Sequence, residues 1–183
     1  MSRMAGQIPV EIRRITDPDG TSRLGAIAYL DGVMSTPDIK DRLATIENEY
    51  FKLLKQCENI LAQTKTLKGR PDAKLRWMLA EKVSTFLDLN AKKNGVVLVN
   101  YTDALKRDLG VSESELRYIF RFYRKYNSAA DLDERINWSK YRELMDFSDE
   151  KTRKQCEALI KEGKIKSDGE IRAFKRKMKT SYN

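Results

Sequence analysis

One long stretch of the sequence, from Pro37 to Leu67, contains no glycine and no second proline. It therefore predicts a single helix, longer than most helices of globular proteins, with Pro37 in its first turn. Its apolar and nearly apolar residues alternate in steps of four and three, which is the spacing of a heptad seam. A chain with such a helix must cover one apolar face along its whole length.

This seam predicts a coiled coil that joins two copies of the chain. The alternative is that the helix packs antiparallel on the C-terminal helices of its own chain, because Leu54 and Leu61 widen the apolar stripe. Both interpretations bury the same face. In the first, the expected dimer interface consists of Ile39, Leu43, Ile46, Tyr50, Leu53, Cys57, Ile60 and Leu67.

A second segment, Tyr101 to Tyr126, predicts two short helices joined by a turn. Gly110 can adopt the left-handed conformation that ends the first helix. Ser112 and Glu115 have the spacing of a capping box that begins the second helix. The segment is therefore typical of a helix-turn-helix unit.

The second helix of this unit is amphipathic and basic. Its apolar residues have the spacing of one buried face, which leaves the arginines and the lysine pointing elsewhere. The residues expected on the buried face are Leu116, Ile119, Phe120 and Tyr123.

The basic residues that the buried face excludes are candidates for DNA contacts. We expect Arg117 and Arg121 to reach base edges, and the cations of the final helix to bind phosphates. A solvated face is the plainer interpretation of either basic stripe alone. The candidate DNA-binding residues are Ser112, Ser114, Arg117, Arg121, Arg124, Lys125, Arg172, Lys175 and Arg176.

The composition favours an anionic partner. The 183 residues include 36 Lys and Arg against 27 Asp and Glu, a formal net charge of +9. A polyanion gains affinity from the release of counterions when Lys and Arg neutralise its phosphates. Residues 71–183 carry 25 of the cations against 18 acids, so the part with the helix-turn-helix segment is also the more basic part.

The composition also argues against most enzymes. The chain has no histidine, the commonest general base and zinc ligand. Its two cysteines are too few for a disulfide scaffold and fit a reducing compartment. It has no glycine-rich phosphate loop, no run of apolar residues long enough to span a membrane and no signal-peptide core. We expect no enzymatic activity, no cofactor, no bound metal, no membrane partner, and a location in the cytoplasm or on the nucleoid.

The sequence divides into three predicted parts. Residues 1–35 predict a β-hairpin, because strand-like segments flank the turn-forming Asp17-Pro18-Asp19-Gly20. Residues 36–68 hold the long helix, and Gly69-Arg70-Pro71 breaks the chain. Residues 72–179 predict an all-helical bundle that contains the helix-turn-helix. The expected fold is mainly α, with an N-terminal β-hairpin, a long coiled-coil-like helix and a C-terminal helical bundle.

Details of the C-terminal part can be predicted locally. The apolar connector 96–99 fits either a short strand or a buried loop. Capping residues predict helix starts at Ser139, at Ser148 and at Ser167 with Glu170. The aromatic residues expected in the core are Trp77, Trp138, Tyr141 and Phe147.

Two segments of this C-terminal part are similar to a known family. LKRDLGVSESELRYIFRFYRKY (105–126) and INWSKYRELMDFSDEKTRKQCEALIKEGKI (136–165) resemble the N-terminal helix-turn-helix domain of the YhcG nuclease family, most specifically at Phe122-Tyr123 and in Trp138-Ser139-x-Tyr141-Arg142-x-Leu144. The resemblance covers roughly residues 72–179 and implies the DNA-binding part of that family without its C-terminal nuclease domain. The last two helices show a more distant similarity to the helical DNA-binding domain of ParB-type partition proteins.

These patterns favour a DNA-binding protein, of the regulator, partition or nucleoid type, that binds duplex DNA as a dimer. The alternative is a non-enzymatic assembly or scaffold protein that uses the coiled coil and the hairpin for protein contacts, because helical bundles serve many functions. A third interpretation is a binder of single strands or RNA, with Tyr118, Phe122 and Tyr126 as stacking platforms.

Overall fold

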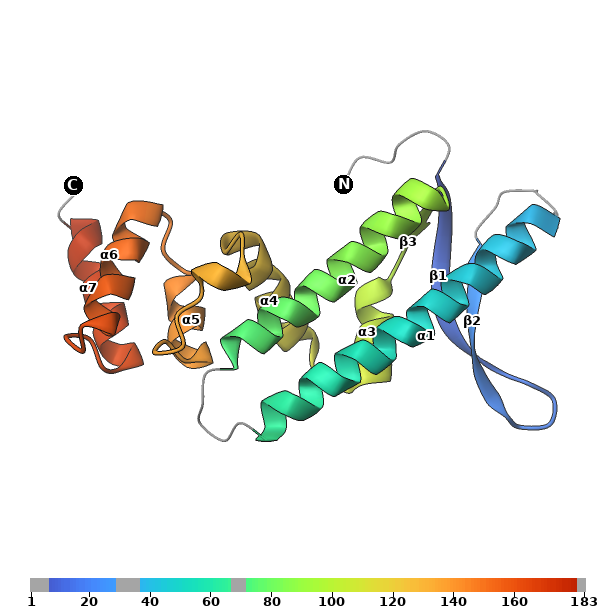
Figure 1. The fold of residues 1–183 in the computed structure, drawn as a ribbon, viewed down its shortest axis with the longest axis horizontal. Helices are drawn as coiled ribbons and strands as arrows, with labels where there is room; N and C mark the ends of the chain where they lie inside the picture. Colours follow the sequence, from blue (N-terminus) through green and yellow to red (C-terminus); the bar gives the residue numbers. More distant parts are fainter. Residues whose placement is uncertain (1–6, 29–36, 67–71, 181–183) are drawn as a thin grey trace. The chain divides into compact units, whose positions relative to one another are not determined.

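The computed structural model describes residues 7–28, 37–66 and 72–180, and these are mainly helical (Figure 1). The strands are β1 (Ile8–Thr16), β2 (Ser22–Ala28) and β3 (Val96–Leu98). The helices are α1 (Pro37–Thr66), α2 (Ala73–Lys93), α3 (Tyr101–Leu109), α4 (Glu113–Lys125), α5 (Trp138–Leu144), α6 (Glu150–Lys161) and α7 (Asp168–Thr180), with a short 3₁₀ turn η1 (Ala129–Asp131).

The chain forms two compact units. Unit 1 consists of residues 1–59 and 81–116, and unit 2 of residues 60–80 and 117–183. Helices α1, α2 and α4 contribute residues to both units. Leu67 and the predicted break at Gly69-Arg70-Pro71 lie outside the described residues, as do residues 1–6 and 29–35 of the predicted hairpin segment.

Unit 1 contains a three-stranded sheet in the order β2-β1-β3. β1 and β2 pair antiparallel, with Ile12 opposite Ala26. Between them Gly20 has a φ of +83°, which only glycine adopts without strain, and its N–H donates to the Asp17 carbonyl at 2.9 Å. β3 pairs parallel with β1, so the apolar connector left open by the sequence forms a strand.

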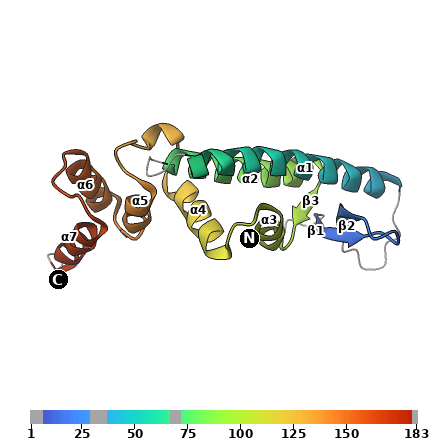
Figure 2. The same ribbon diagram turned by 90° about the horizontal axis from the view of Figure 1, so that it is seen from below.

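Helices α1 and α2 form the helical layer of unit 1. They run side by side in opposite directions (Figures 1 and 2), and the rings of Tyr50 and Phe86 lie 5.9 Å apart. The buried side chains of this layer come from both helices, so one face of α1 is covered within the chain. They include Ile46, Tyr50, Leu53, Leu54, Cys57, Val83 and Phe86.

A buried carboxylate joins three elements of unit 1. The Asp108 side chain is fully buried at the end of α3. It accepts hydrogen bonds from the Tyr50 hydroxyl of α1 at 3.0 Å, from Arg107 at 2.7 Å and from Arg14 of β1 at 3.2 Å. Burial opposes ionisation, but these hydrogen bonds and the positive charge of Arg107 outweigh it and lower the pKa of Asp108. Asp108 therefore holds the sheet, α1 and α3 together as an anion.

An aromatic cluster forms the core of unit 2. The Phe122 ring lies 4.8 Å from Tyr126, 5.2 Å from Trp138 and 5.1 Å from Tyr141. The indole N–H of Trp77 donates to the Tyr126 carbonyl at 2.7 Å, which attaches α2 to the end of α4. The four aromatic residues predicted for the core are all buried, Phe147 included. Such tilted and edge-on ring pairs add to the stabilisation that burial alone provides.

The helix caps of unit 2 agree with the sequence in one case of three. Ser167 and Glu170 form the predicted reciprocal capping box: the Glu170 N–H donates to Ser167 Oγ at 3.2 Å, and the Ser167 N–H donates to Glu170 Oε2 at 3.1 Å. The predictions for Ser139 and Ser148 are wrong. Asn137 caps α5 and Asp149 caps α6, because the helices begin one residue after these side chains.

Candidate nucleic-acid interface

The connection between α3 and α4 has the local chemistry of a tight turn. Gly110 ends α3 with a φ of +65°, and its N–H donates to the Lys106 carbonyl. Ser112 Oγ then accepts the Glu115 N–H at 3.2 Å, which caps the start of α4. Ser114 is exposed beside it, with the two serine Oγ atoms 3.1 Å apart. The predicted end of the first helix and the predicted cap of the second are thus both present.

Helix α4 has one buried and one basic face. Leu116, Ile119, Phe122 and Tyr126 are buried. Phe120 and Tyr123, which were also expected on the buried face, are half-buried. The burial of Phe122 and Tyr126 in the core also removes them as stacking platforms. The exposed side chains at Arg117, Arg121 and Arg124 follow the helical repeat and form what we call the arginine stripe.

Two predicted DNA-binding cations of α4 have partners at the end of α5. Arg121 donates to the Met145 carbonyl at 2.8 Å and forms an ion pair with Asp146 at 2.9 Å. Lys125 donates to the Phe147 carbonyl at 2.8 Å. Carbonyl groups at the end of a helix carry partial negative charge and lack donors, so Arg121 stabilises this end of α5. Arg121 is thus held within the chain and is a weaker candidate for a base edge than the sequence indicated.

The predicted cations of α7 meet the same region of α5. Arg172 forms an ion pair with Glu143 at 2.9 Å, and Lys175 lies 3.8 Å from Asp146. Asp146 therefore joins a cation of α4 and a cation of α7. Arg176 is exposed on α7.

The structure thus divides the nine predicted residues into groups. Arg121, Lys125, Arg172 and Lys175 surround the end of α5. Three more of the nine predicted residues belong to unit 2 and are exposed outside this group: Arg117, Arg124 and Arg176. Ser112 and Ser114 belong to unit 1.

Sequence reasoning missed a buried cation, Arg153 of α6. Its side chain is only 6% exposed, it donates to Glu157 at 3.0 Å, and its guanidinium stacks on the Tyr126 ring at 4.4 Å. The Tyr126 hydroxyl donates to the same Glu157 carboxylate at 2.7 Å. The spacing of Arg153 with the buried Cys156 and Ile160 was the available signal, because it places the arginine on the apolar face.

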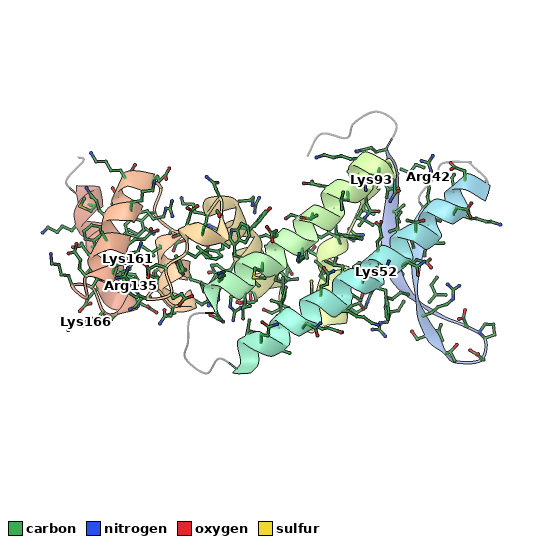
Figure 3. All side chains as sticks on the ribbon, in the orientation of Figure 1. Arg42, Lys52, Lys93, Arg135, Lys161 and Lys166 are labelled. Carbon is green, nitrogen blue, oxygen red and sulfur yellow. The ribbon has the colours of Figure 1, made fainter. Side chains whose placement is uncertain are left out.

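The charge is divided unequally between the units. Unit 2 contains 23 Lys and Arg against 12 Asp and Glu, whereas unit 1 contains 13 against 15. The formal charge is therefore +11 for unit 2 and −2 for unit 1. Figure 3 shows two cations of unit 2, Arg135 and Lys161, that share the Asp133 carboxylate at 2.7 and 3.4 Å. One acid thus pairs with two cations, and unit 2 keeps a large surplus of positive charge.

The residues of the predicted dimer interface are mostly buried within one chain. Ile46, Tyr50, Leu53, Cys57 and Ile60 are covered. Ile39 and Leu43 are half-buried. Burial raises the pKa of the Cys57 thiol to about 12, so it is a poor nucleophile for crosslinking. A coiled coil between two copies stays a prediction, and it would require other groups of the same chain to leave this face.

Comparison with protein-family models, with curated proteins and with solved structures gave no match to this chain. Among the described residues, no helix is both long enough and apolar enough to cross a membrane. The function is therefore inferred from the geometry and the charge of each unit.

Proposed function

We propose that this protein binds duplex DNA through unit 2. The observation that carries the proposal is the charge of +11 in unit 2 beside −2 in unit 1. A folded unit with this surplus attracts polyanions, and phosphate neutralisation with counterion release supplies most of the affinity of non-specific DNA binding. Unit 1 would contribute little to this attraction.

The arginine stripe of α4 is the proposed contact surface. Its three side chains are exposed, and its helix is fixed by an aromatic core on the opposite side. A helix anchored in this way can enter a major groove without losing its own packing. Arg117 and Arg124 are the preferred first contacts, because both are exposed and neither belongs to the group of cations around the end of α5.

In this proposal α4, which begins after the Gly110 turn, acts as the recognition helix, which also agrees with the resemblance to the YhcG family. Duplex DNA is preferred over single strands because the aromatic residues Phe122 and Tyr126 are buried and unavailable for stacking on bases. Dimerisation through α1 is not required for the binding proposed here.

A charge-deletion experiment tests this proposal. Fluorescence anisotropy with a labelled random duplex would compare the wild type with the double variant Arg117→Gln/Arg124→Gln over a series of salt concentrations. Loss of two phosphate contacts should weaken binding about tenfold or more and reduce the slope of log K against log salt by about 2.

The matched control removes two cations from unit 1. Lys52 and Lys93 are exposed on α1 and α2 (Figure 3), so Lys52→Gln/Lys93→Gln deletes the same charge from the other unit. The proposal expects this variant to bind almost as the wild type does. Equal losses for the two double variants would show that net charge alone decides binding and would contradict the assignment to unit 2.

A further inference from the structure

A hollow of about 730 Å³ lies between the C-terminal end of α4 and helix α6, entirely within unit 2. Its lining contains more cations than acids. The cations are Arg124, Lys125, Arg153, Lys154 and Lys161. The acids are Asp131, Glu150 and Glu157.

Two of these cations are not neutralised by a hydrogen-bonded carboxylate. Arg124 donates to the Phe120 carbonyl at 3.3 Å, and Lys125 donates to the Phe147 carbonyl at 2.8 Å. Main-chain carbonyls satisfy donors but carry no net charge, so the positive charge of both residues persists. Burial lowers the pKa of Lys125, and repulsion from Arg153 and Arg121 lowers it further. A bound anion would relieve this crowding of positive charge.

Two of the three acids of the hollow, Glu157 and Glu150, are already paired with cations of the hollow itself. Glu157 accepts from both Arg153 and Tyr126. Glu150 forms an ion pair with Lys154 at 2.9 Å. The buried Arg153 guanidinium adds positive potential from inside, where the dielectric is lower and the field less screened. In the described part of the chain its Nε has no hydrogen-bond partner.

We propose that this hollow, which we call the α4–α6 hollow, binds a phosphate group of the nucleic-acid backbone. Arg124 belongs both to the arginine stripe and to the hollow, so a strand that contacts the stripe reaches the hollow with a neighbouring phosphate. The inference rests on the proposed function and adds a defined phosphate seat to it. Lys154 also lines the hollow, and its side chain is 68% exposed, so it is accessible to that phosphate.

The chain offers a closely matched pair of lysines for the test. Lys154 and Lys164 are both 68% exposed, and each forms an ion pair with a nearby glutamate, at 2.9 and 2.8 Å. Only Lys154 lines the α4–α6 hollow. In duplex titrations followed by anisotropy, Lys154→Gln should weaken binding about fivefold and reduce the salt slope by about 0.9, whereas Lys164→Gln should change neither.

In a second pair of variants an acid is removed, and we expect a gain in duplex affinity. Misfolding cannot produce such a gain. Asp131 lines the hollow, whereas the nearby exposed Glu134 does not. Asp131→Asn should tighten duplex binding several-fold, and Glu134→Gln should tighten it much less. Equal effects within both pairs, with the wild type still binding DNA, would overturn the phosphate seat and leave the proposed function standing. No duplex binding by the wild type would overturn both.

Inorganic phosphate distinguishes a backbone phosphate from a free one. Amide NMR titrations at constant ionic strength would follow the chemical shifts of Ser148 and Lys154 in the wild type. Inorganic phosphate should bind only weakly, with a millimolar dissociation constant, whereas a short duplex should shift both amides at much lower concentration. Tight binding of inorganic phosphate, together with unchanged duplex affinity in Lys154→Gln, would assign the hollow to a free phosphate and overturn the inference.

Discussion

Each unit buries one ionised side chain beside a tyrosine, but the two buried charges have opposite signs. In unit 1 the anion Asp108 accepts from Tyr50 and from two arginines. In unit 2 the cation Arg153 stacks on Tyr126 and donates to Glu157. Each site combines a carboxylate, a tyrosine and at least one arginine, with the sign of the central charge reversed.

This reversal is consistent with the surface charge of each unit. Around Asp108, two arginines of unit 1 are turned toward a buried acid and are partly withdrawn from solvent. In unit 2 the Glu157 carboxylate pairs with the buried Arg153 and accepts a hydrogen bond from Tyr126. Glu157 therefore does not neutralise the exposed cations nearby. A buried ion therefore shapes the charge that remains outside as well as the stability of the core.

The largest expected effect comes from Asp108→Asn. The amide can no longer serve as an anionic acceptor for the Tyr50 hydroxyl and the two arginines, so we expect a loss of about 2 kcal/mol in the free energy of unfolding. Urea denaturation measures it. Asp103→Asn, which removes an exposed acid of the same helix, should stay within about 0.5 kcal/mol of the wild type. Similar values for both variants would show that Asp108 has no special role in unit 1.

The corresponding change in unit 2 is Arg153→Met. It removes the stacking on Tyr126 and the ion pair with Glu157, but Glu157 keeps the Tyr126 hydroxyl as a donor. We expect a somewhat smaller loss of about 1.5 kcal/mol, measured in the same urea titration. The exposed neighbour Lys154→Met is the control and should be close to neutral. A variant as stable as the wild type would mean that the buried cation is dispensable.

A third change perturbs unit 1 without altering its charge. A Cβ added at Gly25 of β2 would overlap Cδ1 of Ile15 and lie 2.9 Å from its Cγ1. Gly25→Ala should therefore cost about 1 kcal/mol. The same change in an Ile15→Val background, which lacks that Cδ1, should cost almost nothing. Equal costs in both backgrounds would contradict this packing. Duplex binding should be unchanged in all three variants, because unit 1 is not the proposed contact surface.

The smallest expected effect is the change in the free energy of unfolding as the pH is lowered. The pKa of Asp108 is lower in the folded chain than its ordinary value of about 4, so its contribution is complete above that value. The contribution is lost as the pH falls through the lower, folded pKa. Wild type should therefore lose more stability than Asp108→Asn below about pH 4. Parallel pH profiles for the two proteins would contradict an ionised Asp108.

Local patterns predicted most of the helices. The absence of glycine and of internal proline predicted α1. The Gly110 turn and the Ser112 cap predicted the boundary between α3 and α4, and Ser167 with Glu170 predicted the start of α7. Each of these depends on residues a few positions apart. The sequence could not decide what covers the face of α1, because a second copy and the chain's own α2 require the same apolar side chains.

The buried ionic sites were beyond local patterns. Asp108 meets Tyr50 and Arg14, which are 58 and 94 positions away in the sequence. Arg121 was expected on a base edge because nothing near it in the sequence showed the carbonyl of Met145 or the carboxylate of Asp146. Pairings over such distances follow from the fold and cannot be predicted from spacing.

The most direct test of the central claim is the salt dependence of duplex binding by the wild-type protein. Fluorescence anisotropy with a labelled random duplex would follow log K against log salt from low to physiological ionic strength. We expect binding at low salt and a straight line whose slope is about −0.9 for each phosphate neutralised, with several phosphates neutralised in total. No binding at low salt would contradict it and would favour an assembly role in which unit 1 and unit 2 contact other proteins.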